Sequence, residues 1–206
     1  MALQGALMWI CSLAVLSSCA AQDETLQCGY NSLTSNLKEA VECDSWSSEE
    51  RAGLLLNLRN LRDKLNRLQL RECQGAEPNK CPQAEVPEDG GLLCTTVSDK
   101  RYCKPMCNHG YDFSFLRRSR VYEECSEQTG FKWQSQFIGG NKLAVCNKAH
   151  IQVSGAASAY FSEDQDCLTT KSNSSLIESA IMGGFMSELR SADVQGEAEN
   201  SCLLCG

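Results

Sequence analysis

The cysteine content constrains this chain more than any other feature of its sequence, because 14 of its 206 residues are cysteines. Residues 1–22 carry no charged side chain and contain an apolar run from Ala6 to Leu16, followed by small residues. This arrangement is typical of a signal peptide. Its removal would take away Cys11 and Cys19 and leave twelve cysteines, an even number that predicts up to six disulfides in an oxidising compartment. We therefore expect a secreted, extracellular protein.

Charge and composition argue against several classes of protein. The formal net charge is −7, whereas a protein that binds nucleic acid needs a basic surface to displace counterions from phosphates. Hydrophobic residues make up 42% of the chain and charged residues 22%, which is typical of a globular fold. No segment after residue 22 has the roughly 20 consecutive apolar residues of a membrane-spanning helix. We expect neither a nucleic-acid nor a membrane partner.

Residues suited to catalysis are few. His109 and His150 are the two histidines of the sequence, and no Gly-x-Ser-x-Gly nucleophile motif occurs. Cys103, Cys107 and His109 could form part of a zinc site, but thiols of a secreted protein are expected to be oxidised, which favours disulfides. We predict a non-enzymatic protein with no metal and no other cofactor.

The mature chain divides into four segments of different composition. A helical segment rich in leucine is followed by a linker rich in proline and glycine. A segment rich in aromatic residues and cysteines comes next, and an acidic region of mixed character ends the chain. These segments cover residues 23–74, 75–93, 94–146 and 147–206, respectively. Together they predict an α+β fold.

Regularly spaced leucines mark the helical segment. Ser47 and Glu50 fit a capping box, which indicates the start of a helix, and a shorter helix is expected over residues 35–42. Five leucines, called here the leucine seam, then recur at steps of 4, 3, 4 and 3 residues: Leu54, Leu58, Leu61, Leu65 and Leu68. This spacing is typical of a coiled coil, although it spans little more than two heptads. The seam predicts either association with other copies of the chain or packing within one chain, and both alternatives stay open.

Two motifs in the segment 94–146 carry a family resemblance. Tyr111, Phe113 and Phe115 alternate with the period of two that is typical of half-buried strands. Cys107 is followed by Asn-His-Gly-Tyr, and Cys125 precedes a Gly-Phe-Lys-Trp sequence that ends at Trp133. In these motifs the segment resembles a sushi (complement control protein) domain. The resemblance predicts a small β-module that is stabilised by two disulfides and one buried tryptophan.

The resemblance also implies a disulfide pairing. In the sushi family the first cysteine pairs with the third and the second with the fourth, which corresponds here to Cys94–Cys125 and Cys107–Cys146. Cys103 is additional to this quartet and needs another partner. The pairing of the cysteines outside the quartet stays open: Cys28, Cys43, Cys73, Cys81, Cys103, Cys167, Cys202 and Cys205.

One basic cluster stands out in this acidic chain. It comprises Arg117, Arg118 and Arg120, together with Lys100, Arg101 and Lys104. The three arginines could contact a polyanion such as a sulfated glycan or an acidic protein, because guanidinium groups pair with oxyanions. They also contain the Arg-x-x-Arg pattern of a processing protease. The third alternative is a solvated loop whose charges are offset by Asp112, Glu123 and Glu124.

The C-terminal region offers one modification site. Asn173-Ser-Ser is a sequon for N-glycosylation, and secretion would make Asn173 accessible to that modification. A capping box at Ser175 predicts a helix with apolar residues at steps of four, among them Phe185 and Leu189. Strands are expected within residues 151–161.

These features together predict a secreted interaction protein. The sushi-like module would bind an extracellular protein or a glycan. The alternative is a structural component of matrix or mucus that forms homo-oligomers through disulfides and the leucine seam.

Overall fold

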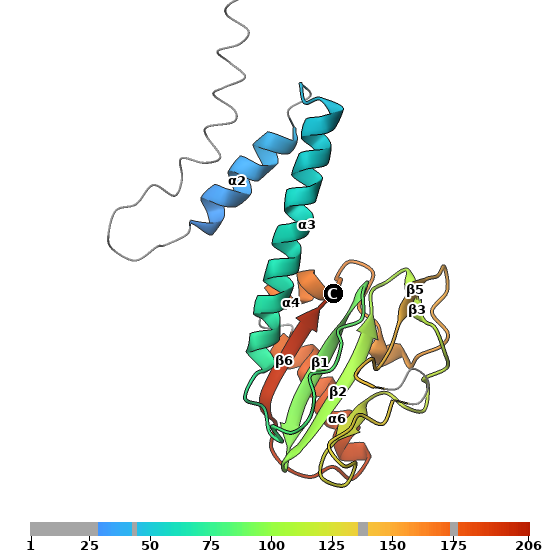
Figure 1. Ribbon diagram of the computed structural model, residues 1–206. Helices are drawn as coiled ribbons and strands as arrows, with labels where there is room; N and C mark the ends of the chain where they lie inside the picture. Colours follow the sequence, from blue (N-terminus) through green and yellow to red (C-terminus); the bar gives the residue numbers. More distant parts are fainter. Residues whose placement is uncertain (1–28, 43–44, 136–139, 174–176) are drawn as a thin grey trace, which may run out of the picture. The chain divides into compact units, whose positions relative to one another are not determined.

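The computed structural model describes residues 29–42, 45–135, 140–173 and 177–206 (Figure 1). The expected signal peptide lies outside these residues. The chain forms two compact units, one that ends at Arg59 and one that comprises Asn60–Gly206. It contains both helices and an antiparallel sheet, so the expected α+β class is confirmed.

Two helices form the described part of the N-terminal unit. Helix α2 covers Tyr30–Val41 and helix α3 covers Ser48–Leu70, so α3 continues into the second unit. The capping box is confirmed, because the Ser47 amide donates to Glu50 Oε2 at 2.8 Å and the Glu50 amide donates to Ser47 Oγ at 3.2 Å. Each side chain thereby satisfies an amide that the helix itself cannot pair.

The larger unit is built on a four-stranded antiparallel sheet. Its strands are β1 (Gly90–Val97), β2 (Lys100–Cys107), β4 (Glu123–Cys125) and β6 (Glu199–Cys205), in the spatial order β4-β2-β1-β6. Ser98 and Asp99 connect β1 to β2, and both have positive φ angles of 49° and 58°. Positive φ at both central residues is the property of a tight type I′ hairpin turn, which matches the twist of the paired strands.

Both faces of this sheet are covered. Helix α6 (Gly183–Ser191) packs on one face, where its side chains Phe185, Met186 and Leu189 join a core with residues of β1, β2 and β6. The opposite face packs against Trp133, Leu143 and the 3-10 helix η2 (Arg71–Cys73). Because alternate strand residues point to opposite faces, Leu92 and Leu93 belong to different cores. Strand β1 is consequently buried along its whole length.

A second, two-stranded sheet lies beside this core. Strand β3 (Tyr111–Phe113) pairs with β5 (Cys146–Lys148) in antiparallel register. The predicted strand at Tyr111 and Phe113 is therefore confirmed. Phe131, Trp133 and Phe137 also alternate in the sequence, but Phe131 and Trp133 lie in no strand, and Phe137 lies outside the described residues.

Five disulfides join the ten cysteines from Cys73 to Cys205. They are Cys73–Cys202, Cys81–Cys125, Cys94–Cys103, Cys107–Cys146 and Cys167–Cys205. The expected Cys107–Cys146 pair is present. The expected Cys94–Cys125 pair is wrong, because the hairpin places Cys94 directly opposite Cys103 and leaves Cys125 to Cys81. Cys28 and Cys43 lie outside the described residues.

The structure joins segments that we expected to be a linker, a module and a separate C-terminal region. Strand β1 starts inside the expected linker 75–93, and it pairs with β6 from the last seven residues before Gly206. Disulfides from Cys73 to Cys202 and from Cys81 to Cys125 also cross the expected boundaries. Residues 60–206 therefore form one compact unit with a shared core.

The C-terminal region is partly as expected. Helix α6 is present and buries Phe185 and Leu189, although a π-helical turn η4 (Ile177–Met182) precedes it, and Ser175 lies outside the described residues. In place of strands, residues 151–161 contain the short 3-10 helix η3 (Ala157–Ala159), which is followed by helix α4 (Cys167–Ser172). No helix among the described residues is long and apolar enough to cross a membrane.

Candidate functional site

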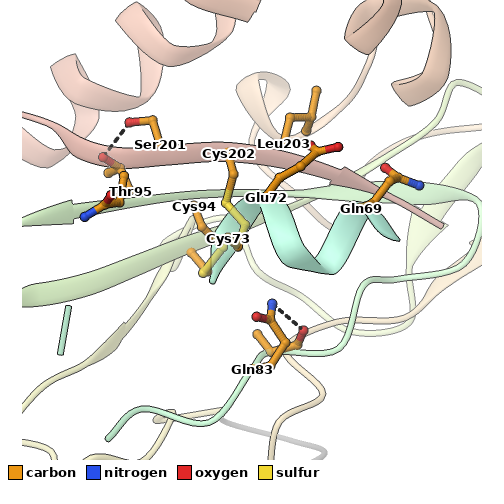
Figure 2. Close-up of a disulfide and its surroundings, with 12 residues drawn as sticks. Gln69, Glu72, Cys73, Gln83, Cys94, Thr95, Ser201, Cys202 and Leu203 are labelled. Atoms are coloured by element: carbon orange, nitrogen blue, oxygen red, sulfur yellow. Dashed lines mark hydrogen bonds between the residues drawn. A yellow bond between two sulfur atoms is a disulfide. The ribbon is translucent and has the colours of Figure 1, made fainter. Parts of the chain in front are cut away.

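Four cysteines from distant parts of the chain meet on one face of the sheet. In the register of the strands, Cys94 on β1 lies directly opposite both Cys103 on β2 and Cys202 on β6. Cys202 is bonded to Cys73, which ends η2 (Figure 2). All four side chains are buried. We call Cys73, Cys94, Cys103 and Cys202 the cysteine cluster.

A buried arginine contacts this cluster. Arg101 is two residues before Cys103 on β2, so both side chains lie on the same face. The Arg101 side chain is only 6% exposed and donates from Nη2 to Cys202 Sγ at 3.1 Å. Its Nη1 donates to Asn200 O at 2.7 Å and to Thr96 Oγ1 at 3.2 Å. Burial without an acidic partner lowers the pKa of Arg101 to about 10.

A small cavity opens beside the cluster. It has a volume of about 40 Å³, and its lining includes Arg101, Trp133 and three members of the cluster: Cys73, Cys94 and Cys103. Trp133 is buried as expected, and its indole Nε1 donates to Pro82 O at 2.8 Å. A cavity of this size admits a water molecule or a small group of atoms.

The basic cluster of the sequence is not a common surface. Arg117 is only 4% exposed and pairs with the buried Glu123 at 3.1 Å. Lys104 and Arg101 are buried as well, and Lys104 Nζ pairs with Glu188 at 2.6 Å. The expectation that Arg117 contacts a polyanion is therefore wrong, because its charge is neutralised inside the core.

The other two arginines remain nearer the surface. Arg120 is half-buried and pairs with Glu123 at 2.6 Å, whereas Arg118 is exposed and donates from Nε to Val153 O at 2.8 Å. Glu123 thus offsets the charges of Arg117 and Arg120, as expected if acidic residues neutralise the cluster. It does so through ion pairs with a buried carboxylate and not in a solvated loop. Asp112 serves other groups, since it accepts hydrogen bonds from the Val153 and Ser154 amides.

An open groove lies between the β4 region and α6. Its volume is about 650 Å³. Its lining combines apolar surface with hydroxyl, carboxylate, amide and guanidinium groups, and it comprises Ser119, Arg120, Val121, Tyr122, Glu124, Gln134, Ser187, Glu188, Ser191 and Ala192. These groups can donate and accept hydrogen bonds on several sides of a polar ligand.

The leucine seam is largely unpacked. The structure describes all of α3, and none of its residues is buried. Leu61, Leu65 and Leu68 are 53%, 60% and 50% exposed, whereas Leu54 and Leu58 are half-buried. Packing within the described part of the chain does not cover the second half of the seam.

Two candidate sites of the sequence remain, the sequon at Asn173 and the alternative zinc ligands Cys103, Cys107 and His109. Asn173 is exposed at the end of α4, an arrangement compatible with its expected glycosylation. Cys103 and Cys107, considered as zinc ligands with His109, are both disulfide-bonded. Within the described ranges, no group of three histidine, cysteine or acidic side chains is placed to hold a metal ion.

The contact between Arg101 and the cysteine cluster was not predicted from the sequence. The available signal was the alternation on β2, which puts Arg101 and Cys103 on one face. The contact to Cys202 spans about half of the chain and had no local signal.

A scan of protein-family models, a search of curated proteins and a search of solved structures each gave no match to this chain.

Proposed function

We propose that this chain is a secreted, non-enzymatic protein that associates with copies of itself through the leucine seam of α3. The observation that carries the proposal is the exposure of the seam: three of its five leucines are at least half exposed in the single chain. Burial of one leucine is worth about 1.5–3 kcal/mol, so leaving several exposed is unfavourable unless a partner covers them.

A second copy of the chain is the occupant that the pattern favours. Steps of 4, 3, 4 and 3 residues place the leucines in one stripe, which is the geometry that matches an identical helix in a coiled coil. Leu56 lies on the opposite side of α3 from the seam and interrupts no part of the stripe. The five disulfides of the larger unit also pair all ten described cysteines within one chain, so none of these ten is free to join two copies.

Secretion is supported by the same disulfides. Ten paired cysteines are typical of proteins that fold in an oxidising compartment, and the uncharged, apolar N-terminus adds the pattern of a signal peptide.

The test compares the Leu61→Lys variant with Leu56→Lys. Both leucines are about half exposed and both changes add one positive charge to α3, but only Leu61 belongs to the seam. We expect the wild-type protein and Leu56→Lys to form oligomers by light scattering after size-exclusion chromatography, and Leu61→Lys to be a folded monomer. Electrophoresis with and without reductant shows whether the oligomer is also covalent.

A second candidate function is the binding of a polar ligand by a monomer. The groove between the β4 region and α6 favours it, because its hydroxyl and carboxylate groups and the ring of Tyr122 are the chemistry with which proteins bind glycans and polar protein surfaces. The sushi-like motifs of residues 94–146 imply recognition of a protein or a glycan in the same way. A monomeric wild-type protein would contradict self-association and support this candidate.

A further inference from the structure

The Cys73–Cys202 disulfide is the only one in the described part of the chain whose sulfur accepts a hydrogen bond from a cationic side chain. The Arg101 guanidinium lies 3.1 Å from Cys202 Sγ, and no carboxylate forms an ion pair with it among the described residues. A cation beside a sulfur stabilises the thiolate form and lowers the pKa of the thiol. Arg101 is therefore placed to stabilise Cys202 when its disulfide opens.

We propose that Cys73–Cys202 is a thiol–disulfide exchange site for an external thiolate. The incoming thiolate attacks Cys73 Sγ and forms a mixed disulfide with it, while the Cys73–Cys202 bond breaks. Cys202 leaves with the electron pair as a thiolate beside the Arg101 guanidinium. A second external thiolate then releases Cys73 as a thiol, and the two external thiols leave as one disulfide, so two electrons pass to the protein.

The surroundings of the two sulfurs define the direction of attack. Cys73 lines the 40 Å³ cavity, whereas Cys202 does not. A good leaving thiol in an exchange reaction has a low pKa, and Cys202 is the partner that contacts the cation. Attack on Cys73 from the cavity, with departure of Cys202 beside Arg101, is therefore the favoured direction.

The bond has a defined structural role. It connects η2, which follows directly on α3, to the edge strand β6 (Figure 2). Without it, the end of α3 keeps two hydrogen bonds between the Gln69 side chain and the backbone of Cys205, and the Glu72–Lys171 ion pair. Exchange would loosen this end of α3 from β6 and leave the other four disulfides intact. The proposal does not depend on self-association.

The first experiment maps reduction in the full oxidised protein. The protein is incubated with increasing dithiothreitol, free thiols are alkylated, and the labelled cysteines are identified by peptide mass spectrometry. We expect Cys73 and Cys202 to be labelled at a concentration about tenfold lower than the cysteines of the other four disulfides. With glutathione, the mixed disulfide should form on Cys73. Labelling of another pair first, or glutathione on Cys202, would overturn the proposal.

The second experiment tests Arg101. The Arg101→Gln variant removes the charge, whereas Arg101→Lys keeps it as a matched control. If Arg101 lowers the pKa of the Cys202 thiol by one unit, the equilibrium constant for reduction of the disulfide rises up to tenfold. We expect Arg101→Gln to be reduced about tenfold less readily than the wild type and Arg101→Lys to lie between them. Equal reduction of all three would contradict the role of Arg101.

A third measurement is independent of the folding of the Arg101 variants. The Cys73→Ser variant keeps Arg101 and leaves Cys202 without its disulfide partner. The pH dependence of its alkylation gives the pKa of the Cys202 thiol, which we expect to be clearly below the ordinary value of about 8.5. A midpoint at or above that value would refute the stabilisation of the thiolate.

Discussion

Arg117 and Arg118 are adjacent in the sequence but differ in almost every physical property. The Arg117 guanidinium is buried between Glu123 and the carbonyl of Leu143, which it contacts at 3.1 and 2.9 Å. Arg118 is exposed and makes its hydrogen bond to a backbone carbonyl at the surface. Nothing in the Arg-Arg-Ser-Arg pattern distinguishes them, because burial depends on which residues the fold brings to them.

At the residue scale, we predict different costs for two alanine variants. Removal of one partner of a buried ion pair costs about 3–5 kcal/mol where the other charge is left unpaired, but Glu123 keeps Arg120 as a partner. Arg117→Ala should therefore lower the free energy of unfolding by about 3 kcal/mol, the lower end of that range, and Arg118→Ala by less than about 1 kcal/mol. Urea denaturation of both variants under non-reducing conditions measures the difference. Equal effects of the two changes would place Arg117 outside the core.

At the scale of single elements, β1 depends on close approach to its neighbours. A Cβ atom on Gly91 would lie 2.4 Å from Cys167 Sγ and 3.1 Å from Leu204 O. The adjacent Gly90 has the same property, since its Cβ would lie 2.2 Å from Met106 O. The Gly90-Gly91 pair was expected to belong to a linker. Both positions require glycine, because neighbouring strands and α4 pack directly against the backbone there.

We predict that Gly91→Ala destabilises the larger unit by about 3 kcal/mol, because a side chain inserted into a full core forces its neighbours apart. Gly184→Ala is the matched control, since its Cβ would have nothing within 4 Å and the change adds a better helix former to α6. The control should be neutral or stabilising by up to about 1 kcal/mol. Thermal unfolding of both variants checks this. A tolerated Gly91→Ala would mean that β1 and α4 pack less closely.

At the scale of the whole molecule, the larger unit depends on segments from both ends of residues 60–206. Strand β6 completes the sheet, and the disulfides to Cys73 and Cys81 attach the segment before β1. Residues 94–146, by contrast, lack β6, α6 and the partner of Cys125.

We therefore predict that residues 60–206 fold as an isolated fragment, whereas residues 94–146 do not. A fragment below about 60 residues buries little apolar surface, and here it would also lose α6 from one face of its sheet and η2 from the other. Near-ultraviolet circular dichroism and disulfide mapping of the two fragments provide the measurement. A folded 94–146 fragment with a Cys94–Cys125 bond would contradict this prediction and support an autonomous sushi-like module.

Features that depend on neighbours in the chain were predictable from the sequence. The capping box at Ser47, the helix that carries the leucine seam, the strand at Tyr111 and the disulfide-rich character follow from spacing and composition. Each rests on contacts within a few residues or on a property of the whole composition. The period of two or 3.6 residues is imposed by the backbone and needs no distant partner.

Features that depend on distant partners were decided by the tertiary structure. Strand β6 pairs with β1 about one hundred residues away, and this pairing places Cys202 beside Cys94 and within reach of Arg101. The same fold buries Lys104 and Arg117, whose local sequence indicated a basic surface. The sequence alone determined which chemical groups the chain carries and its local helices and turns. Only the tertiary structure decided which cysteines pair and which charges are buried, because both depend on distances between segments that the sequence separates.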